Sequence, residues 1–136
     1  MRELGNWGSR TDMQRITTKS FTDLLAWRRA HELSLLVYSV TKTFPVNERR
    51  GLTDQLRRAS VSVTSNLAEG FGRRTPSDKA YRYSLAAGSL YEIQSQLLIS
   101  RDLGLLLQEE FQKASGLSVE SARLINRLIA VVNGRP

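Results

Sequence analysis

Apolar residues recur at steps of three and four positions from Leu24 onward, which is the spacing of helices that bury one face. The first helix is predicted from Leu24 to Phe44, with a capping box formed by Ser20 and Asp23 at its start. Pro45 ends this helix, because the residue before a proline is pushed out of the helical region. The predicted inward face consists of Trp27, Ala30, Leu33, Val37, Val40 and Phe44.

The second helix is predicted from about Leu52 to Glu69, where Gly70 and Gly72 are expected to loosen its end. An ordinary amphipathic helix would carry large aliphatic residues every three or four positions. Here the inward residues are more modest in size, which allows neighbouring backbones to come close. They are Leu52, Leu56, Ala59, Val63 and Leu67.

The third helix has a clear start, with Thr75 as N-cap and Pro76 at the first helical position. It is predicted to end at Leu103 and Gly104, the glycine supplying a left-handed cap. Its inward face is predicted to carry Ala80, Tyr83, Ala87, Leu90 and Leu97. The fourth helix is predicted over residues 107–132, with Phe111, Leu117, Leu124, Leu128 and Val131 inside.

Four helices joined by short connections, with no segment typical of a strand, predict an all-α fold. The expected architecture is an antiparallel up-down-up-down four-helix bundle over residues 21–133. Residues 1–20 are polar and show little periodicity, so we expect a disordered N-terminal tail. Within this tail, either Met1 or Met13 is the true start of the protein.

A second stripe on the first helix lies on a different face from the predicted core. It consists of Leu24, His31, Leu35 and Tyr38. One apolar face is enough to bury an intramolecular core. We therefore expect another subunit to cover this stripe, and we predict that the bundle assembles as a homo-oligomer.

The 136-residue chain carries a formal net charge of +7. Residues 48–74 contribute six basic and three acidic residues, or +3, the largest excess of any segment. Such a balance favours partners rich in phosphate, chiefly nucleic acid, although it also keeps a protein soluble. The chain has no cysteine, no apolar stretch long enough to span a bilayer and no signal-peptide core. We expect a cytoplasmic protein with no membrane partner.

The residue types of catalytic and metal sites are scarce in this chain. His31 is the sole histidine, and it lacks the glutamate three residues earlier that di-iron bundles use. The glycines around Phe71 lack the lysine and the preceding strand of a phosphate-binding loop. The serines of the second helix have no histidine in their own segment to activate them. We predict no catalytic residue, no metal and no cofactor, and we expect His31 to pack or cap.

The segment from Gln55 to Arg74 concentrates the remaining polar chemistry. Paired arginines lie at both its ends, and the planar guanidinium group donates two parallel hydrogen bonds to a phosphate. The candidate nucleic-acid-binding residues are Arg57, Arg58, Arg73 and Arg74, with solvation or subunit pairing as their alternative role. Buried polar groups need partners, so a polar network that fixes helix register and oligomer geometry is also predicted. Its candidate members are Ser65, Asn66, Glu69 and Glu92.

Several stretches resemble the bacterial four-helix-bundle proteins named after ribosomal RNA intervening sequences. The signature is the segment Gln55–Arg74, and the match extends to Phe21–Leu33, Thr43–Pro45 and Ala86–Ser100. The resemblance runs roughly from Phe21 to the fourth helix, which is nearly the whole part of the chain that is expected to be ordered. Thr64 is a departure, since the family usually has proline at this position.

The resemblance implies a four-helix bundle that assembles as a ring-like homopentamer. Some members are encoded within intervening sequences of large-subunit ribosomal RNA genes, and no catalytic residues are attributed to the family. The chain also resembles, more distantly, the accessory protein of diversity-generating retroelements. That pentameric protein binds nucleic acid and a reverse transcriptase through a basic surface.

The sequence thus favours a non-enzymatic, homo-oligomeric module that binds RNA or another nucleic acid. The alternative is an oligomeric scaffold for a protein partner, in which the arginines and the polar network serve subunit interfaces. A third reading, an enzyme with a site between subunits, has no supporting histidine, cysteine or metal pattern. Base-specific readout is not expected, because few aromatic residues sit beside the arginines in the sequence.

Overall fold

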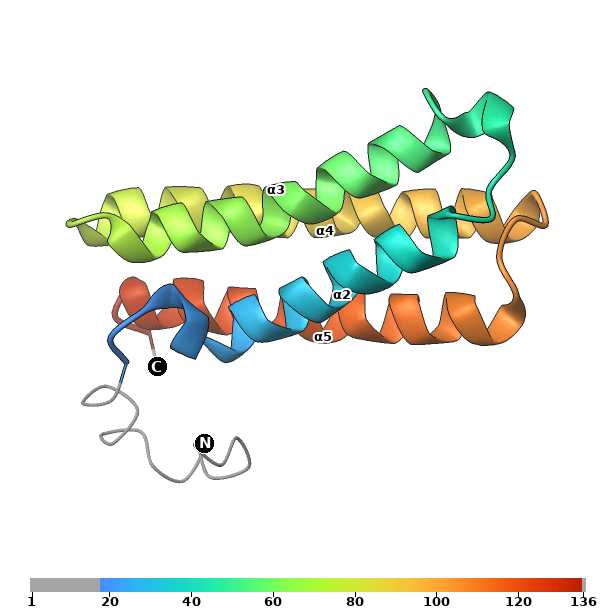
Figure 1. Ribbon diagram of the computed structural model, residues 1–136. Coiled ribbons are helices and arrows are strands. Elements are labelled where there is room, and N and C mark those ends of the chain that lie inside the picture. The colour runs from blue at the N-terminus through green and yellow to red at the C-terminus, as the bar shows by residue number, and fades with distance from the viewer. Residues whose placement is uncertain (1–17, 136) are drawn as a thin grey trace.

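The computed structural model describes residues 18–135, which form a bundle of four long helices (Figure 1). The elements are η2 (Phe21–Asp23), α2 (Leu25–Thr41), η3 (Val46–Glu48), α3 (Leu52–Gly72), α4 (Pro76–Asp102) and α5 (Gln108–Val132), where η denotes a 3-10 helix. Consecutive helices run in opposite directions, and α5 packs against α2 as well as α4. No strand occurs in the described residues, and the predicted all-α bundle is confirmed. The predicted tail lies outside the described residues apart from positions 18–20, as does Met13.

The inward faces predicted for the first three helices are confirmed with two exceptions. Trp27 and Ala80 are only partly buried, whereas every other residue predicted on those faces is buried. The core has one continuous centre along the bundle axis, where burial of apolar side chains stabilises the fold. Its largest fully buried apolar side chains are Leu33, Leu56, Leu67, Leu90, Ile93, Leu97 and Ile125.

The prediction for the inward face of the fourth helix is wrong, because the predicted residues do not lie at the centre of its buried face. The buried residues of α5 are mostly small: Ala114, Ser118, Ser121, Ala122 and Ile125. The predicted Phe111, Leu117, Leu124 and Leu128 are partly buried at the flanks, and Val131 is 59% exposed. The small buried residues let α5 lie close to its two neighbours, α2 and α4. Larger side chains fit only on either side of this close contact between helices.

The predicted ends of the third helix are confirmed. The hydroxyl of Thr75 accepts a hydrogen bond from the backbone N–H of Asp78 at 3.1 Å, which caps the start of α4. At the other end, Gly104 adopts the left-handed conformation with φ of 75°. The N–H groups of Gly104 and Leu105 then bond back to the carbonyls of Arg101 and Ser100, the pattern of a Schellman motif.

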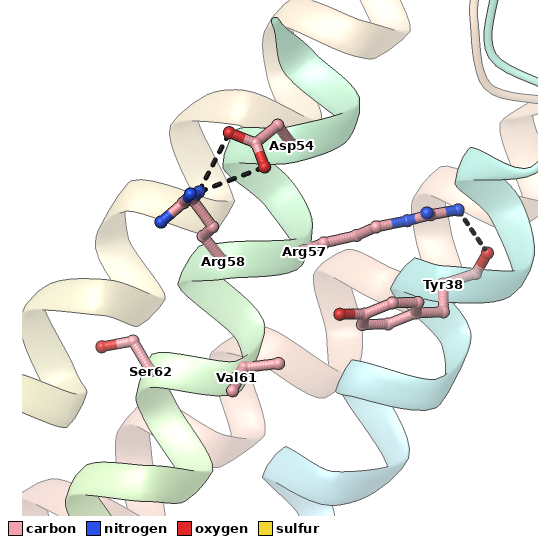
Figure 2. A pocket seen from close by; sticks show the side chains of 6 residues that line it. All are labelled: Tyr38, Asp54, Arg57, Arg58, Val61 and Ser62. Carbon is pink, nitrogen blue, oxygen red and sulfur yellow. Dashed lines mark hydrogen bonds and ion pairs between the residues drawn. The ribbon is translucent and has the colours of Figure 1, made fainter. Parts of the chain in front are cut away.

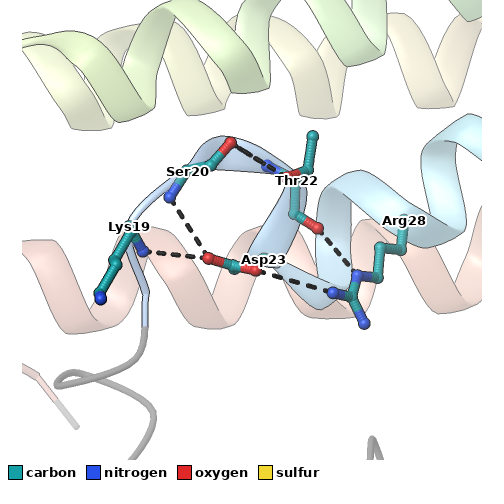
Figure 3. A network of polar contacts seen from close by, with 5 residues as sticks. All are labelled: Lys19, Ser20, Thr22, Asp23 and Arg28. Atoms are coloured by element: carbon teal, nitrogen blue, oxygen red, sulfur yellow. Dashed lines mark hydrogen bonds and ion pairs between the residues drawn. The ribbon is translucent and has the colours of Figure 1, made fainter. Parts of the chain in front are cut away.

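The predicted capping box exists, but it caps η2 rather than the first long helix (Figure 3). The Ser20 hydroxyl accepts a hydrogen bond from the N–H of Thr22, and the Asp23 carboxylate accepts hydrogen bonds from the N–H groups of Lys19 and Ser20. Arg28 of α2 donates from Nε to the carbonyl of Thr22 at 2.8 Å. The short 3-10 helix is thereby fixed to the first turns of α2.

Gly70 does not loosen the end of the second helix, because α3 continues to Gly72. A Cβ atom at Gly70 would lie 2.6 Å from the ring of Tyr83, so the absent side chain is what lets α3 and α4 approach. Tyr83 is buried, and this burial raises the pKa of its hydroxyl to about 12. Lys79 of α4 donates from Nζ to the carbonyls of Gly70 and Phe71 at 3.3 and 2.7 Å, which satisfies the last carbonyls of α3. The prediction of a loose helix end is therefore wrong.

Candidate functional site

Arg57 of α3 contacts residues of α2 and so holds the two helices together (Figure 2). Its Nε donates to the hydroxyl of the buried Thr41 at 2.9 Å, and its Nη2 approaches the carbonyl oxygen of Tyr38 at 3.5 Å. The guanidinium carbon also lies 4.7 Å from the centre of the Tyr38 ring, a cation–π arrangement. Arg57 is therefore engaged within the chain and is less available to a phosphate than its sequence position suggests.

Arg58 points the other way, toward Asp54 (Figure 2). Its Nε donates to both carboxylate oxygens of Asp54, at 3.1 and 3.0 Å. The side chain of Arg58 remains 79% exposed. An exposed ion pair one helical turn apart contributes only a few tenths of a kcal/mol, so a phosphate can compete for this guanidinium.

The second pair of arginines lies just past the C-terminal end of α3, about 24 Å from Arg57 at 1.5 Å per helical residue. Arg73 forms an ion pair with Glu69 at 3.1 Å, and Arg82 approaches the same carboxylate at 3.5 Å. Arg74 is exposed and has no ion pair with any described residue. The four candidate arginines therefore form two separate basic positions rather than one patch.

Two further arginines, which were not among the candidates, are better placed for an outside partner. Arg49 and Arg50 lie at the connection between η3 and α3, and both are exposed. Within residues 18–135, neither forms an ion pair. The signal that could have found them was already in the sequence, since they belong to the segment with the largest excess of positive charge.

The two neighbouring arginines of α3 should respond very differently to charge reversal. Arg57→Glu is expected to lower the free energy of unfolding by about 1–3 kcal/mol, because it leaves Thr41 and the Tyr38 ring without their partner. Arg58→Glu is expected to change it by less than about 1 kcal/mol, since the lost ion pair is exposed. Urea unfolding followed by circular dichroism measures both, and equal losses would contradict the bracing role of Arg57.

The four members of the predicted polar network are not brought together. Asn66 is half-buried, and its Nδ2 donates to the carbonyl and hydroxyl of Ser62 at 2.9 and 3.2 Å. The Ser62 hydroxyl in turn lies 2.9 Å from that of Ser89, which links α3 to α4. Ser65, Glu69 and Glu92 are exposed, so these three do not belong to a buried network. Sequence reasoning missed the two serines, since small hydroxyl residues carry no distinctive spacing.

The predicted stripe on the first helix faces outward in the single chain. Leu35 is 60% exposed and Tyr38 is 40% exposed, while Leu24 is partly buried. His31 is exposed, and its ring stacks on Trp27 with centres 4.7 Å apart, a packing contact. Whether another subunit covers the stripe stays a prediction.

The outer side of α4 exposes further apolar residues that the sequence analysis did not single out. They are Tyr81, Leu85, Tyr91, Leu98 and Ile99. Residues 83–100 contain Glu92 as their single charged residue. A helix that is apolar on more than its core-facing side is typical of a surface that another protein covers.

The residues near the start of α3 line an open surface pocket together with Tyr38 of α2 (Figure 2). Its lining residues are Tyr38, Asp54, Arg57, Arg58, Val61 and Ser62. Tyr38 was not predicted as a neighbour of the arginines, because it lies 19 positions before Arg57 in the chain. A register argument could have found it. In a helical hairpin, positions equally far from the connection face each other, and Tyr38 and Arg57 are nearly equidistant from Asn47.

These features define a basic four-helix bundle with exposed arginines and exposed apolar faces. Among residues 18–135 there is no group of three or more histidine, cysteine, aspartate or glutamate side chains that could hold a metal ion. No helix in the same part of the chain is long and apolar enough to cross a membrane.

Comparison with known proteins places the chain within this class. The profile described as 23S rRNA-intervening sequence protein matches residues 22–127, so the chain belongs to that family. Its fold is similar to the crystal structure of a protein with unknown function from the S23 ribosomal protein family of Bacteroides thetaiotaomicron VPI-5482. The two share 18% sequence identity with a TM-score of 0.71, over 77% of this chain and 98% of the other. No curated protein matches the sequence.

Proposed function

We propose that this chain is a non-enzymatic, cytoplasmic binding protein that associates with RNA or another nucleic acid through exposed arginines. The observation that carries the proposal is the net charge of +7, together with exposed arginines that have no carboxylate partner in the described chain. These arginines are Arg49, Arg50, Arg74, Arg123, Arg127 and Arg135. The first three lie in residues 48–74, the segment with the largest excess of positive charge. Unpaired guanidinium groups bind backbone phosphates without competition from an internal carboxylate, and they release counterions from the nucleic acid.

The proposal includes assembly as a homopentamer. Support comes from the family resemblance, from the exposed Leu35 of α2 and from the exposed apolar residues of α4, which a second copy of the chain would cover. Five copies of a +7 chain would carry 5 × 7 = +35. Several weak contacts per assembly would then combine into useful avidity.

The test is fluorescence anisotropy of a labelled, structured RNA titrated with the protein across a salt series. If about five phosphates are neutralised on a duplex, log affinity should fall with log salt at a slope near −4.5. Arg49→Glu with Arg50→Glu removes two cations and should make this slope shallower by about 1.8. Affinity that is independent of salt, or no binding even at low salt, would contradict the proposal.

A matched control variant distinguishes binding at a defined site from attraction by the net charge of the whole chain. Arg123→Glu with Arg127→Glu changes the charge by the same amount at two exposed positions on α5. We expect this pair to reduce RNA affinity much less than the pair at Arg49 and Arg50. Equal losses would mean that net charge alone drives the association.

A second candidate function is an oligomeric scaffold for a protein partner, which the apolar outer side of α4 favours. On this alternative, the exposed arginines serve contacts between subunits. Light scattering distinguishes the two functions. Dissociation of the oligomer by Arg49→Glu with Arg50→Glu favours the scaffold, whereas an intact oligomer that has lost RNA favours nucleic-acid binding.

A further inference from the structure

The pocket at the start of α3 brings a tyrosine of α2 next to residues of α3 that lie close together in the sequence. Tyr38 comes from α2, whereas the two arginines and Val61 come from α3. Tyr38 and Val61 are 40% and 42% exposed, so the pocket presents an aromatic ring and an aliphatic side chain to solvent. The guanidinium groups of Arg57 and Arg58 line the same pocket.

The aromatic part of the pocket is held in place before any partner arrives. Thr41 is buried, and its hydroxyl fixes the Nε of Arg57 at 2.9 Å. Arg57 in turn keeps its guanidinium over the Tyr38 ring. An aromatic ring stacked with an arginine is a surface on which nucleobases stack, since every base has a π-face and the guanidinium plane is also a stacking partner.

Arg58 supplies the second element of a nucleotide site. It is largely exposed, and its ion pair with Asp54 is of the weak, solvent-screened kind. A backbone phosphate that displaces Asp54 gains a guanidinium contact but meets the repulsion of that carboxylate. We therefore expect stacking, rather than the phosphate contact, to contribute most of the affinity at this pocket.

We propose that the pocket formed by Tyr38, Arg57, Arg58 and Val61 binds an unpaired nucleobase, so that the nucleic acid is single-stranded where it contacts this pocket. This inference rests on the proposed function and specifies its ligand, and it requires that Tyr38, unlike the rest of the predicted stripe, stays uncovered in the assembly. A base in a duplex must be unstacked and unpaired before it can enter a protein pocket, whereas the bases of single strands, loops and bulges are already accessible.

The test uses a short single-stranded RNA that contains 2-aminopurine, whose fluorescence falls when it stacks, and the same strand annealed to its complement. Tyr38→Leu is expected to weaken single-strand binding about tenfold and to abolish the fluorescence change. Tyr38→Phe keeps the ring and should bind within about twofold of the wild type. Tyr81→Leu is the matched control, because Tyr81 is also exposed and lies beside an arginine, Arg82, but does not line the pocket.

Each other outcome overturns the inference in a different way. If single strand and duplex bind equally and Tyr38→Leu has no effect, while Arg49→Glu with Arg50→Glu weakens both, the proposed function stands without this pocket. If neither nucleic acid binds at low salt, both proposals fail. If Tyr38→Leu changes the oligomeric state measured by light scattering, the pocket belongs to a subunit interface.

Discussion

Leu33→Ala is expected to lower the free energy of unfolding by about 2–5 kcal/mol, because it empties part of a fully buried site. Leu35→Ala, two positions along the same helix, is the matched control. Leu35 is 60% exposed in the single chain, so in an unassembled chain its truncation should change the stability by less than about 0.5 kcal/mol. The two leucines differ only in the side of α2 on which they lie.

Urea unfolding at several protein concentrations measures both variants. The loss for Leu33→Ala should appear at every concentration, since the residue lies inside one chain. For Leu35→Ala, a loss as large as that of Leu33→Ala would contradict the expectation for an isolated chain. If that loss also changed with protein concentration, it would show that another subunit covers the predicted stripe.

Gly70→Ala is expected to destabilise the bundle by about 1–3 kcal/mol, because the added methyl group would overlap the ring of Tyr83. The ring cannot move away cheaply, since it is buried between α3 and α4. Gly88→Ala offers the opposite case. Gly88 is exposed within α4, and a Cβ atom there would meet nothing within 4 Å. This substitution should stabilise the protein by about 0.5–1 kcal/mol, through helix propensity alone.

Thermal unfolding followed by circular dichroism compares the two glycine variants under identical conditions. Opposite signs are the expected result. If Gly70→Ala were neutral or stabilising, α3 and α4 would have room to separate at this point. The close approach inferred at Gly70 would then not be a requirement of the fold.

The helix pattern could be predicted from the sequence wherever one residue type decides the local structure. Thr75 and Gly104 fix the ends of α4 through a side-chain cap and a left-handed turn, and both act within a few residues of the chain. The small buried residues of α5 could not be predicted in this way. Ser118 and Ser121 are fully buried because two other helices meet there, a fact that depends on three-dimensional packing and not on hydrophobicity.

The same distinction holds for the candidate site. Arg57 and Arg58 are equivalent in sequence, yet one contacts α2 and the other contacts Asp54 on its own helix. The direction of each side chain follows from the 100° rotation between neighbours on a helix, but its partner follows from the fold. Tyr38 joins the arginines only once α2 and α3 have paired.

The order in which the helices pack has a kinetic consequence. Helices that follow one another along the chain also lie side by side, while α5 with α2 and α3 with the short η2 are contacts between segments that are not consecutive. Bundles with mostly local contacts fold within microseconds to milliseconds. Association of subunits is instead a second-order step, whose rate depends on how often two chains meet. A refolding trace of the proposed oligomer should therefore show a fast phase that is insensitive to dilution, followed by a slower phase that dilution delays.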